Sequence, residues 1–263
     1  MVPAGRPHRG RHPHRGRVRA VGAVRTEPAG GSATRTFLVV CEPAPVTATL
    51  YTAGDSPPGA AAARPALVLA HGAGAGQRHP FMVSFARGLA ARGIDVMTFN
   101  FPYMEQGRKV PDRASVLEAC YRQAIDAARR ETQAAERGLF IGGKSMGGRM
   151  ATHVAAADAS LALAGLVLLG YPLHPPGRPD KRRDAHLPAV GRPTLVVQGS
   201  RDTFGTPDEL RPALDAMHPA PTLHVVSGGD HSFKVSGAGA KGQADVEQDI
   251  LAVVADWIHA AVA

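Results

Sequence analysis

"GLFIGGKSMGGRMA", residues 138–151, is the stretch on which the fold of this 263-residue chain depends. It fits two templates at once. Gly-x-x-x-x-Gly-Lys-Ser is typical of a phosphate-binding loop, and Gly-x-Ser-x-Gly is typical of a nucleophilic serine on a sharp turn. The first template predicts a nucleotide-binding protein and the second an enzyme with a serine nucleophile. The two interpretations exclude each other, because they place the preceding strand differently.

The phosphate-binding interpretation fails on the position of that strand. A phosphate-binding loop needs its strand before the first glycine, because the amides that follow wrap the phosphate. The residues at that place, "ETQAAERG" (131–138), are polar and read as the end of a helix, whereas residues 139–142 are apolar and form the strand themselves. No expected strand ends in an aspartate that could hold magnesium. The sequence therefore favours the serine interpretation.

Glycines around Ser145 suit a strand that turns sharply into a helix. Gly143 and Gly147 lie two residues to either side of Ser145 and have no Cβ to clash where strand and helix nearly touch. The same turn leaves the amide of Met146 at a helix N-terminus, in front of the serine oxygen. A serine that merely caps a helix fits the motif too, so the prediction needs catalytic partners elsewhere in the chain.

Apolar segments alternate with helical segments through most of the chain. Two segments rich in β-branched residues, "TFLVV" (36–40) and "VTATLY" (46–51), predict an antiparallel start. Apolar strands are then expected at 66–70, 95–100, 138–143, 164–170, 193–199 and 222–228, with helices near 80–92, 112–134, 145–158, 206–217 and 243–261. Nearly continuous apolar strands between helices indicate a parallel sheet covered on both faces. We predict a doubly wound α/β domain of about eight strands, with its active site beyond the carboxyl ends of the strands.

The partners of a nucleophilic serine are a histidine base and a carboxylate that orients it. Asp202 follows the expected strand 193–199 and His231 follows the strand 222–228, in the chain order Ser, Asp, His that this arrangement requires. Asp230 is an alternative acid, but it directly precedes His231 and is poorly placed to bond to that ring. The predicted catalytic residues are Ser145, Asp202 and His231.

Other loops at the same sheet edge supply candidates for the oxyanion hole and the substrate pocket. The loop "HGAGAG" (71–76) is expected to offer the amide of Ala73 beside that of Met146, with His71 bracing the loop. Lys144 and Arg149 flank the serine and either recognise an acidic substrate group, pair with a local carboxylate or face solvent. The residues expected to bind substrate are Tyr103, Met104, Lys144, Tyr171, His174, Phe204 and Phe233.

Charge is concentrated at the N-terminus. The net charge is +8, but residues 1–35 hold eight arginines and one acid, or +7, which leaves +1 for residues 36–263. The early part of this segment alternates Arg, His, Pro and Gly without a helical or strand period, so we expect a disordered basic tail over 1–35 and one domain over 36–263. It lacks aromatic residues to stack on bases, so a nucleic-acid partner is not favoured. No segment is apolar enough for a secretory signal or a membrane span.

The two cysteines, Cys41 and Cys120, do not make a disulfide framework, and no Cys/His spacing resembles a zinc site. We therefore expect no metal and no cofactor, and a reducing, cytoplasmic compartment.

Six motifs in order resemble a known family: "LAHGAGAG", "FNFPYMEQG", "IGGKSMGGRMA", "LGYPLHPPG", "VQGSRDTFG" and "GDHSF". Over roughly residues 64–262 the chain resembles α/β-hydrolase-like proteins related to dienelactone hydrolases, a family that also includes a testis-expressed protein and a subunit of an animal histone-acetyltransferase complex. The resemblance implies an α/β-hydrolase fold, with Ser145, Asp202 and His231 at the triad-like positions. Dienelactone hydrolases use a cysteine where this chain has Ser145, so that particular activity is not implied.

Two functions follow as expectations. The first is a serine hydrolase acting on a small carboxylic ester or thioester, and the second is a non-catalytic binding or scaffold protein with the same fold. The segment 171–192 is too short and too rich in proline and charge for a helical cap, so we predict no cap domain and an open site.

Overall fold

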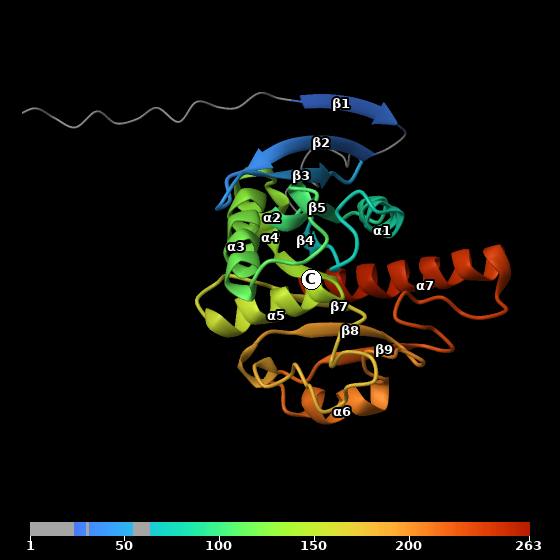
Figure 1. The fold of residues 1–263 in the computed structure, drawn as a ribbon. Coiled ribbons are helices and arrows are strands. Elements are labelled where there is room, and N and C mark those ends of the chain that lie inside the picture. Colours follow the sequence, from blue (N-terminus) through green and yellow to red (C-terminus); the bar gives the residue numbers. More distant parts are fainter. Residues whose placement is uncertain (1–23, 30–31, 55–63) are drawn as a thin grey trace, which may run out of the picture.

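The computed structural model describes residues 24–29, 32–54 and 64–263, and in them nine strands form one sheet in the order β1-β2-β3-β5-β4-β6-β7-β8-β9 (Figure 1). The antiparallel part consists of β1 (Val24–Ala29), β2 (Ser32–Val39) and β3 (Val46–Tyr51). β3 also pairs antiparallel with β5, the first strand of the parallel part. The parallel part is β4 (Ala66–Ala70), β5 (Asp95–Phe99), β6 (Leu139–Lys144), β7 (Gly165–Leu169), β8 (Thr194–Gly199) and β9 (Thr222–Val226). The predicted antiparallel start and parallel sheet are confirmed.

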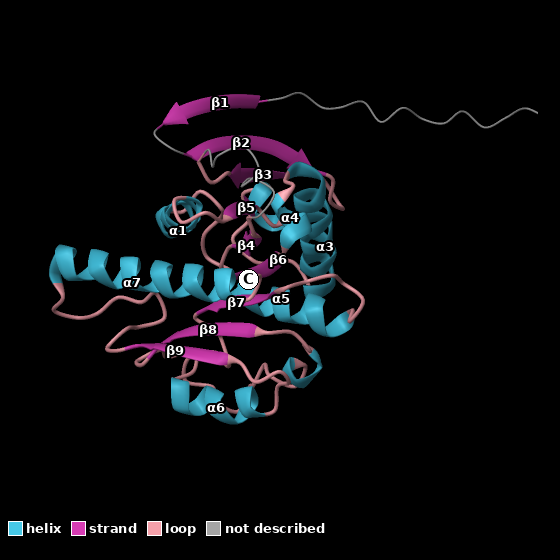
Figure 2. Cartoon of the chain, turned by 180° about the vertical axis from the view of Figure 1, so that it is seen from behind, coloured by secondary structure: helices cyan, strands magenta, loops and turns pink. Residues whose placement is uncertain are grey.

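Helices cover both faces of the sheet (Figures 1 and 2). One face carries α3 (Ala114–Glu131) and α5 (Met146–Ala157), and the other carries α1 (Pro80–Ala90) and α7 (Gly239–Ala260). The remaining helices are α2 (Pro102–Glu105), α4 (Ala134–Arg137) and α6 (Pro207–Asp215). Every residue of β4, β5 and β7 is buried, which is why these strands read as unbroken apolar runs. The doubly wound α/β prediction is confirmed.

The register of the central strands brings their carboxyl ends to one edge of the sheet. Ala70 of β4 pairs with Gly143 of β6, and Lys144 of β6 pairs with Leu169 of β7. The chain leaves each strand at this edge, so the loops that carry the predicted site residues converge there. The connection from β7 to β8 contains a single short 3-10 turn, η2 (Leu187–Ala189), and this fully described segment forms no helical cap.

The predicted boundary of the N-terminal tail is wrong. Residues 24–29 and 32–35 were expected to be disordered, yet Val24 pairs with Thr36 and Ala29 with Ser32, and Thr34 continues the sheet beside Tyr51. β1 is an edge strand with a hydrogen-bonded neighbour on one side only, so its composition carries little of the signal that marks a buried strand. Residues 1–23 of the predicted tail lie outside the described residues.

The two cysteines lie together in the core between the β2–β3 connection and α3. Their sulfur atoms are 2.9 Å apart and both thiols are free and buried. Hydrogen bonding to Cys41, together with burial, raises the pKa of the Cys120 thiol far above its usual range. Cys120 therefore stays protonated and is a poor nucleophile. Among the helices described here, none combines the length and apolar composition that a membrane span requires.

Candidate active site

Ser145 lies at the turn between β6 and α5 with a backbone conformation that non-glycine residues rarely adopt. Its φ is 51° and its ψ is −115°. The amide of Ser145 donates to the carbonyl of Leu169 on the neighbouring strand, at 2.9 Å, which fixes the turn against β7. Backbone strain of this kind persists where the surrounding structure enforces it, and it presents the hydroxyl beyond the sheet edge.

The glycines around Ser145 are required by close backbone contacts. A Cβ on Gly143 would lie 2.4 Å from the carbonyl oxygen of Ala70, and a Cβ on Gly147 would lie 2.3 Å from the same atom. Real Cβ atoms do not approach backbone this closely, so any side chain here would force strand and helix apart. The crossing expected from the Gly-x-Ser-x-Gly pattern is present.

The structure brings Ser145, His231 and Asp202 into one hydrogen-bonded row. The Oγ of Ser145 is 2.8 Å from Nε2 of His231, and Nδ1 of that ring is 2.8 Å from Oδ2 of Asp202. Only 1% of Asp202 is exposed to solvent. Asp230, the alternative acid, instead accepts hydrogen bonds from the amides of Ser232 and Lys234 and holds the turn that follows His231.

Asp202 and His231 are each held by a second contact. The Asp202 carboxylate accepts from Nε2 of Gln198 and from the amide of Phe204, both at 2.8 Å. The ring of Phe204 stacks on the imidazole of His231 with centroids 4.1 Å apart. Gln198 was missed in the sequence, although a glutamine at a fully buried position of β8 is the signal that would have found it.

Lys144 tethers the loop that carries His231. Its ammonium donates to the carbonyl oxygen of His231 at 2.5 Å and lies over the ring of Phe233, 5.3 Å from the centroid. Burial lowers the pKa of Lys144 to about 8, and the nearby charge of Asp202 opposes that shift. The side chain also borders the cavity described below. Of the expectations for this residue, local pairing is the one observed, with a backbone carbonyl in place of a carboxylate.

The loop predicted to form the oxyanion hole is braced by two buried side chains. The hydroxyl of Tyr103 donates to the carbonyl of Ala73 at 2.9 Å. His71 lies 2.7 Å from the carbonyl of Gly72 through Nδ1, and its Nε2 accepts from the amide of Phe101 at 3.0 Å. Ala73 and Met146 both line the cavity, and within the described residues neither backbone amide donates to a protein acceptor. They remain available to an oxygen atom in front of Ser145.

Acidification is expected to weaken the fold through His71. Burial lowers the pKa of His71 to about 4 from 6.5. Between those pH values His71 binds a proton in the unfolded chain but not in the folded chain. The free energy of unfolding therefore falls as the pH falls through this window. From pH 6.5 to 4 the free energy of unfolding of the wild type should fall by roughly 3 kcal/mol more than that of His71→Gln. Urea unfolding at several pH values measures both. If the free energies of unfolding of the two proteins fall in parallel with pH, the expectation is contradicted. The pKa of His186 is also lowered, but His186 is present in both proteins, so its contribution cancels in the comparison.

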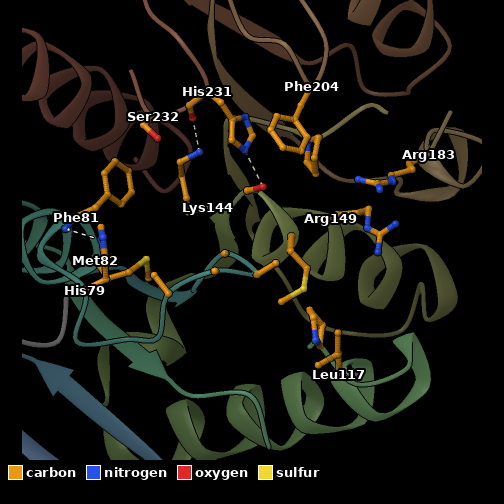
Figure 3. Close-up of a pocket in the computed structure, with 18 of the residues that line it drawn as sticks. His79, Phe81, Met82, Leu117, Lys144, Arg149, Arg183, Phe204, His231 and Ser232 are labelled. Atoms are coloured by element: carbon orange, nitrogen blue, oxygen red, sulfur yellow. Dashed lines mark hydrogen bonds between the residues drawn. The ribbon is translucent and has the colours of Figure 1, made fainter. Parts of the chain in front are cut away.

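A cavity of about 690 Å³ opens in front of Ser145 (Figure 3). Its floor is the glycine-rich loop of residues 72–75, the serine turn and the His231 ring. Apolar walls come from Phe81, Met82 and Leu117, and charged walls come from Lys144, Arg149, Arg183 and Lys234. The cavity therefore combines an apolar lining with several cations close to the predicted nucleophile.

The predicted substrate-binding set is only partly in this cavity. Lys144 and Phe204 line it, whereas the other five predicted residues are not among its lining residues: Tyr103, Met104, Tyr171, His174 and Phe233. Their loops follow strands as expected. The side chains turn into the core, because aromatic groups at a sheet edge gain more by burial than by exposure.

Each of these five residues has a contact within the protein. Tyr103 braces the oxyanion loop, and Met104 packs half-buried against the core. The hydroxyl of Tyr171 donates to the carbonyl of Arg183 at 2.6 Å. His174 is buried beside Pro175, and Phe233 packs near Phe81, with centroids 6.2 Å apart. Sequence reasoning missed Arg183 and Phe81, because nothing local shows that a charged loop residue or a residue in the first turn of α1 faces the cavity.

A parallel sheet wound on both faces, with a serine at a strand-to-helix turn and a histidine and an aspartate on later loops, defines the α/β-hydrolase class of proteins. The chain belongs to the alpha/beta hydrolase domain family, whose model matches residues 63–259. The predicted fold and family are confirmed.

Solved structures with this fold have low sequence identity to the chain. A cold-adapted esterase from an Arctic intertidal metagenomic library is 17% identical over 92% of this chain and 100% of its own, with a TM-score of 0.63. A dienelactone hydrolase from Anabaena variabilis is 18% identical over 86% of this chain and 97% of its own, with a TM-score of 0.65. A serine hydrolase without a lid from Xanthomonas campestris is 20% identical, over 87% and 96% of the two chains, with a TM-score of 0.60. At these identities the likeness concerns the fold.

Proposed function

We propose that this protein is a serine hydrolase that cleaves small carboxylic esters or thioesters. The observation that carries the proposal is the hydrogen-bonded row of Ser145, His231 and Asp202, which opens onto a cavity of about 690 Å³. A serine hydroxyl becomes a good nucleophile when a histidine takes its proton and a buried carboxylate holds that histidine in one tautomer. The distances of 2.8 Å along this row support the proposal.

In the proposed reaction, Ser145 Oγ bonds to the acyl carbon while its proton passes to Nε2 of His231. The carbonyl oxygen gains the electron pair of its π bond and is stabilised by the amides of Ala73 and Met146. The tetrahedral intermediate then collapses, the bond to the alcohol or thiol breaks, and His231 returns the proton to the leaving group. Water, deprotonated by the same ring, releases the acid and restores Ser145.

The comparisons and the shape of the site support this class of reaction. Solved structures similar to the chain include proteins described as esterases and as a serine hydrolase without a lid. No helical cap covers the cavity in the described part of the chain, so a long alkyl chain would lie partly in water and would gain little of the approximately 0.8 kcal/mol per methylene that burial supplies. Short acyl groups are the proposed substrates.

A fluorophosphonate probe tests the proposal, because it labels serines that are activated by a neighbouring base. The folded protein should gain one adduct, and peptide mass mapping should place that adduct on Ser145. Ser160→Ala, which removes an exposed serine away from the cavity, should label like the wild type, and the urea-unfolded protein should not label. Absence of labelling, together with no turnover of p-nitrophenyl acetate or butyrate, would contradict the proposal and indicate a non-catalytic protein with this fold.

A further inference from the structure

Two arginine side chains lie near each other on the same side of the cavity. Arg149 projects from α5 and Arg183 from the connection between β7 and β8 (Figure 3). Neither guanidinium forms an ion pair with any carboxylate among the side chains that the structure describes, whereas Arg178 and Arg182, on the same connection as Arg183, pair with Asp180 and Asp184. The two cavity arginines are therefore distinct from their neighbours on the surface.

Arg149 is held under conditions that disfavour an unpaired charge. Its Nε atom is buried and has no hydrogen-bond partner in the described part of the chain. Burial, and after it the like charge of Arg183, lower the pKa of Arg149. A buried polar atom without a partner and two unscreened like charges both cost free energy. An anion bound between the two guanidinium groups would remove the cost of the like charges.

The backbones at the two arginines are fixed in place. The amide of Arg149 donates to the carbonyl of Ser145 at 3.1 Å, so Arg149 lies one helical turn from the nucleophile. The amide of Arg183 donates to the carbonyl of Leu173 at 2.8 Å, and the carbonyl of Arg183 accepts from the buried hydroxyl of Tyr171 at 2.6 Å. The fixed backbones mean that little main-chain conformational entropy is lost when a ligand binds.

The surrounding charges add to the same preference. Lys144 and Lys234 also line the cavity, while Asp112 is the one carboxylate among its described lining residues. Asp112 is already paired with Arg108, at 2.6 Å. The cavity therefore presents positive charge to an incoming substrate.

We propose that Arg149 and Arg183 form an anion subsite, and that the substrate is an ester or thioester whose acyl part carries a carboxylate. This inference rests on the proposed function, because it names the substrate of the same site. His231 must return its proton to the leaving group, so the leaving group lies beside that ring. Figure 3 shows Arg149 on α5, apart from the His231 ring, and we therefore assign Arg149 to the acyl side of the scissile bond. Paired guanidinium groups suit the planar geometry of a carboxylate.

The test compares two esters with the same leaving group and the same number of acyl carbons: mono-p-nitrophenyl glutarate, which carries a carboxylate, and p-nitrophenyl valerate, which is neutral. After subtraction of the uncatalysed rate, kcat/KM of the full-length wild type should favour the glutarate ester by about tenfold or more. This ratio should fall about tenfold in Arg149→Gln and in Arg183→Gln. Arg178→Gln, which removes an exposed arginine of the same connection, should keep the wild-type ratio.

A second measurement does not depend on turnover. Calorimetry should detect glutarate binding to Ser145→Ala, and adding Arg183→Gln should weaken that binding about tenfold. If the wild type hydrolyses the valerate ester but shows a ratio near one, the anion subsite is overturned and the proposed function stands. If neither ester is hydrolysed while glutarate still binds through Arg183, the proposed function is overturned and the anion subsite is supported. Absence of binding together with a ratio near one would refute the subsite on both counts.

Discussion

Ser145→Ala is expected to abolish ester hydrolysis, with kcat reduced on the order of 10⁶-fold. The hydroxyl is the atom proposed to bond to the acyl carbon, and no other described side chain hydrogen-bonds to Nε2 of His231. His231→Ala should lose a similar amount, because an unactivated serine is a poor nucleophile. The double variant should be no slower than either single variant, since the two residues act as one unit.

Steady-state kinetics with p-nitrophenyl butyrate measures these three variants, and thermal unfolding verifies that each is folded. Ser160→Ala provides the matched control, because Ser160 is exposed and bonds locally to Asp158. Losses that multiply in the double variant would show that Ser145 and His231 act independently. Residual activity within tenfold of the wild type in Ser145→Ala would remove this residue from the mechanism.

Asp202→Asn is expected to lower kcat by about 10⁴-fold while the protein stays folded. The carboxylate accepts from three donors: Nδ1 of His231, Nε2 of Gln198 and the amide of Phe204. An asparagine has one acceptor oxygen, so its NH₂ group must face at least one of these donors. The imidazole is the partner that can respond, by moving its proton to Nε2, and in that tautomer it cannot take the proton of Ser145.

The kinetics of Asp202→Asn should be compared with those of Asp180→Asn, which changes a carboxylate that is 65% exposed and pairs only with Arg178. The control should match the wild type. A kcat for Asp202→Asn within tenfold of the wild type, in a protein with unchanged thermal unfolding, would mean that Asp202 does not set the tautomer of His231.

The sequence by itself determined the parallel sheet, the position of the serine turn and the order of its partners. These features are local or periodic. A strand buried on both faces must be apolar along its length, and a strand that nearly touches the following helix needs Gly143 and Gly147 beside Ser145. Asp202 and His231 could be placed because each follows a recognisable strand, and parallel strands end at one edge.

Only the tertiary structure decided which side chains of those loops face the cavity. Tyr103 and Tyr171 were expected in the pocket but turn inward, because each hydroxyl finds a backbone carbonyl to satisfy it inside the protein. Arg183 was not expected there, since a charged residue in an irregular connection carries no pattern. Its orientation toward Arg149 depends on how a distant strand and helix pack, which local sequence does not encode. The residues proposed to carry chemistry at Ser145 were therefore readable from the sequence. The charge of the group that the site is proposed to accept depends instead on contacts between residues far apart in sequence.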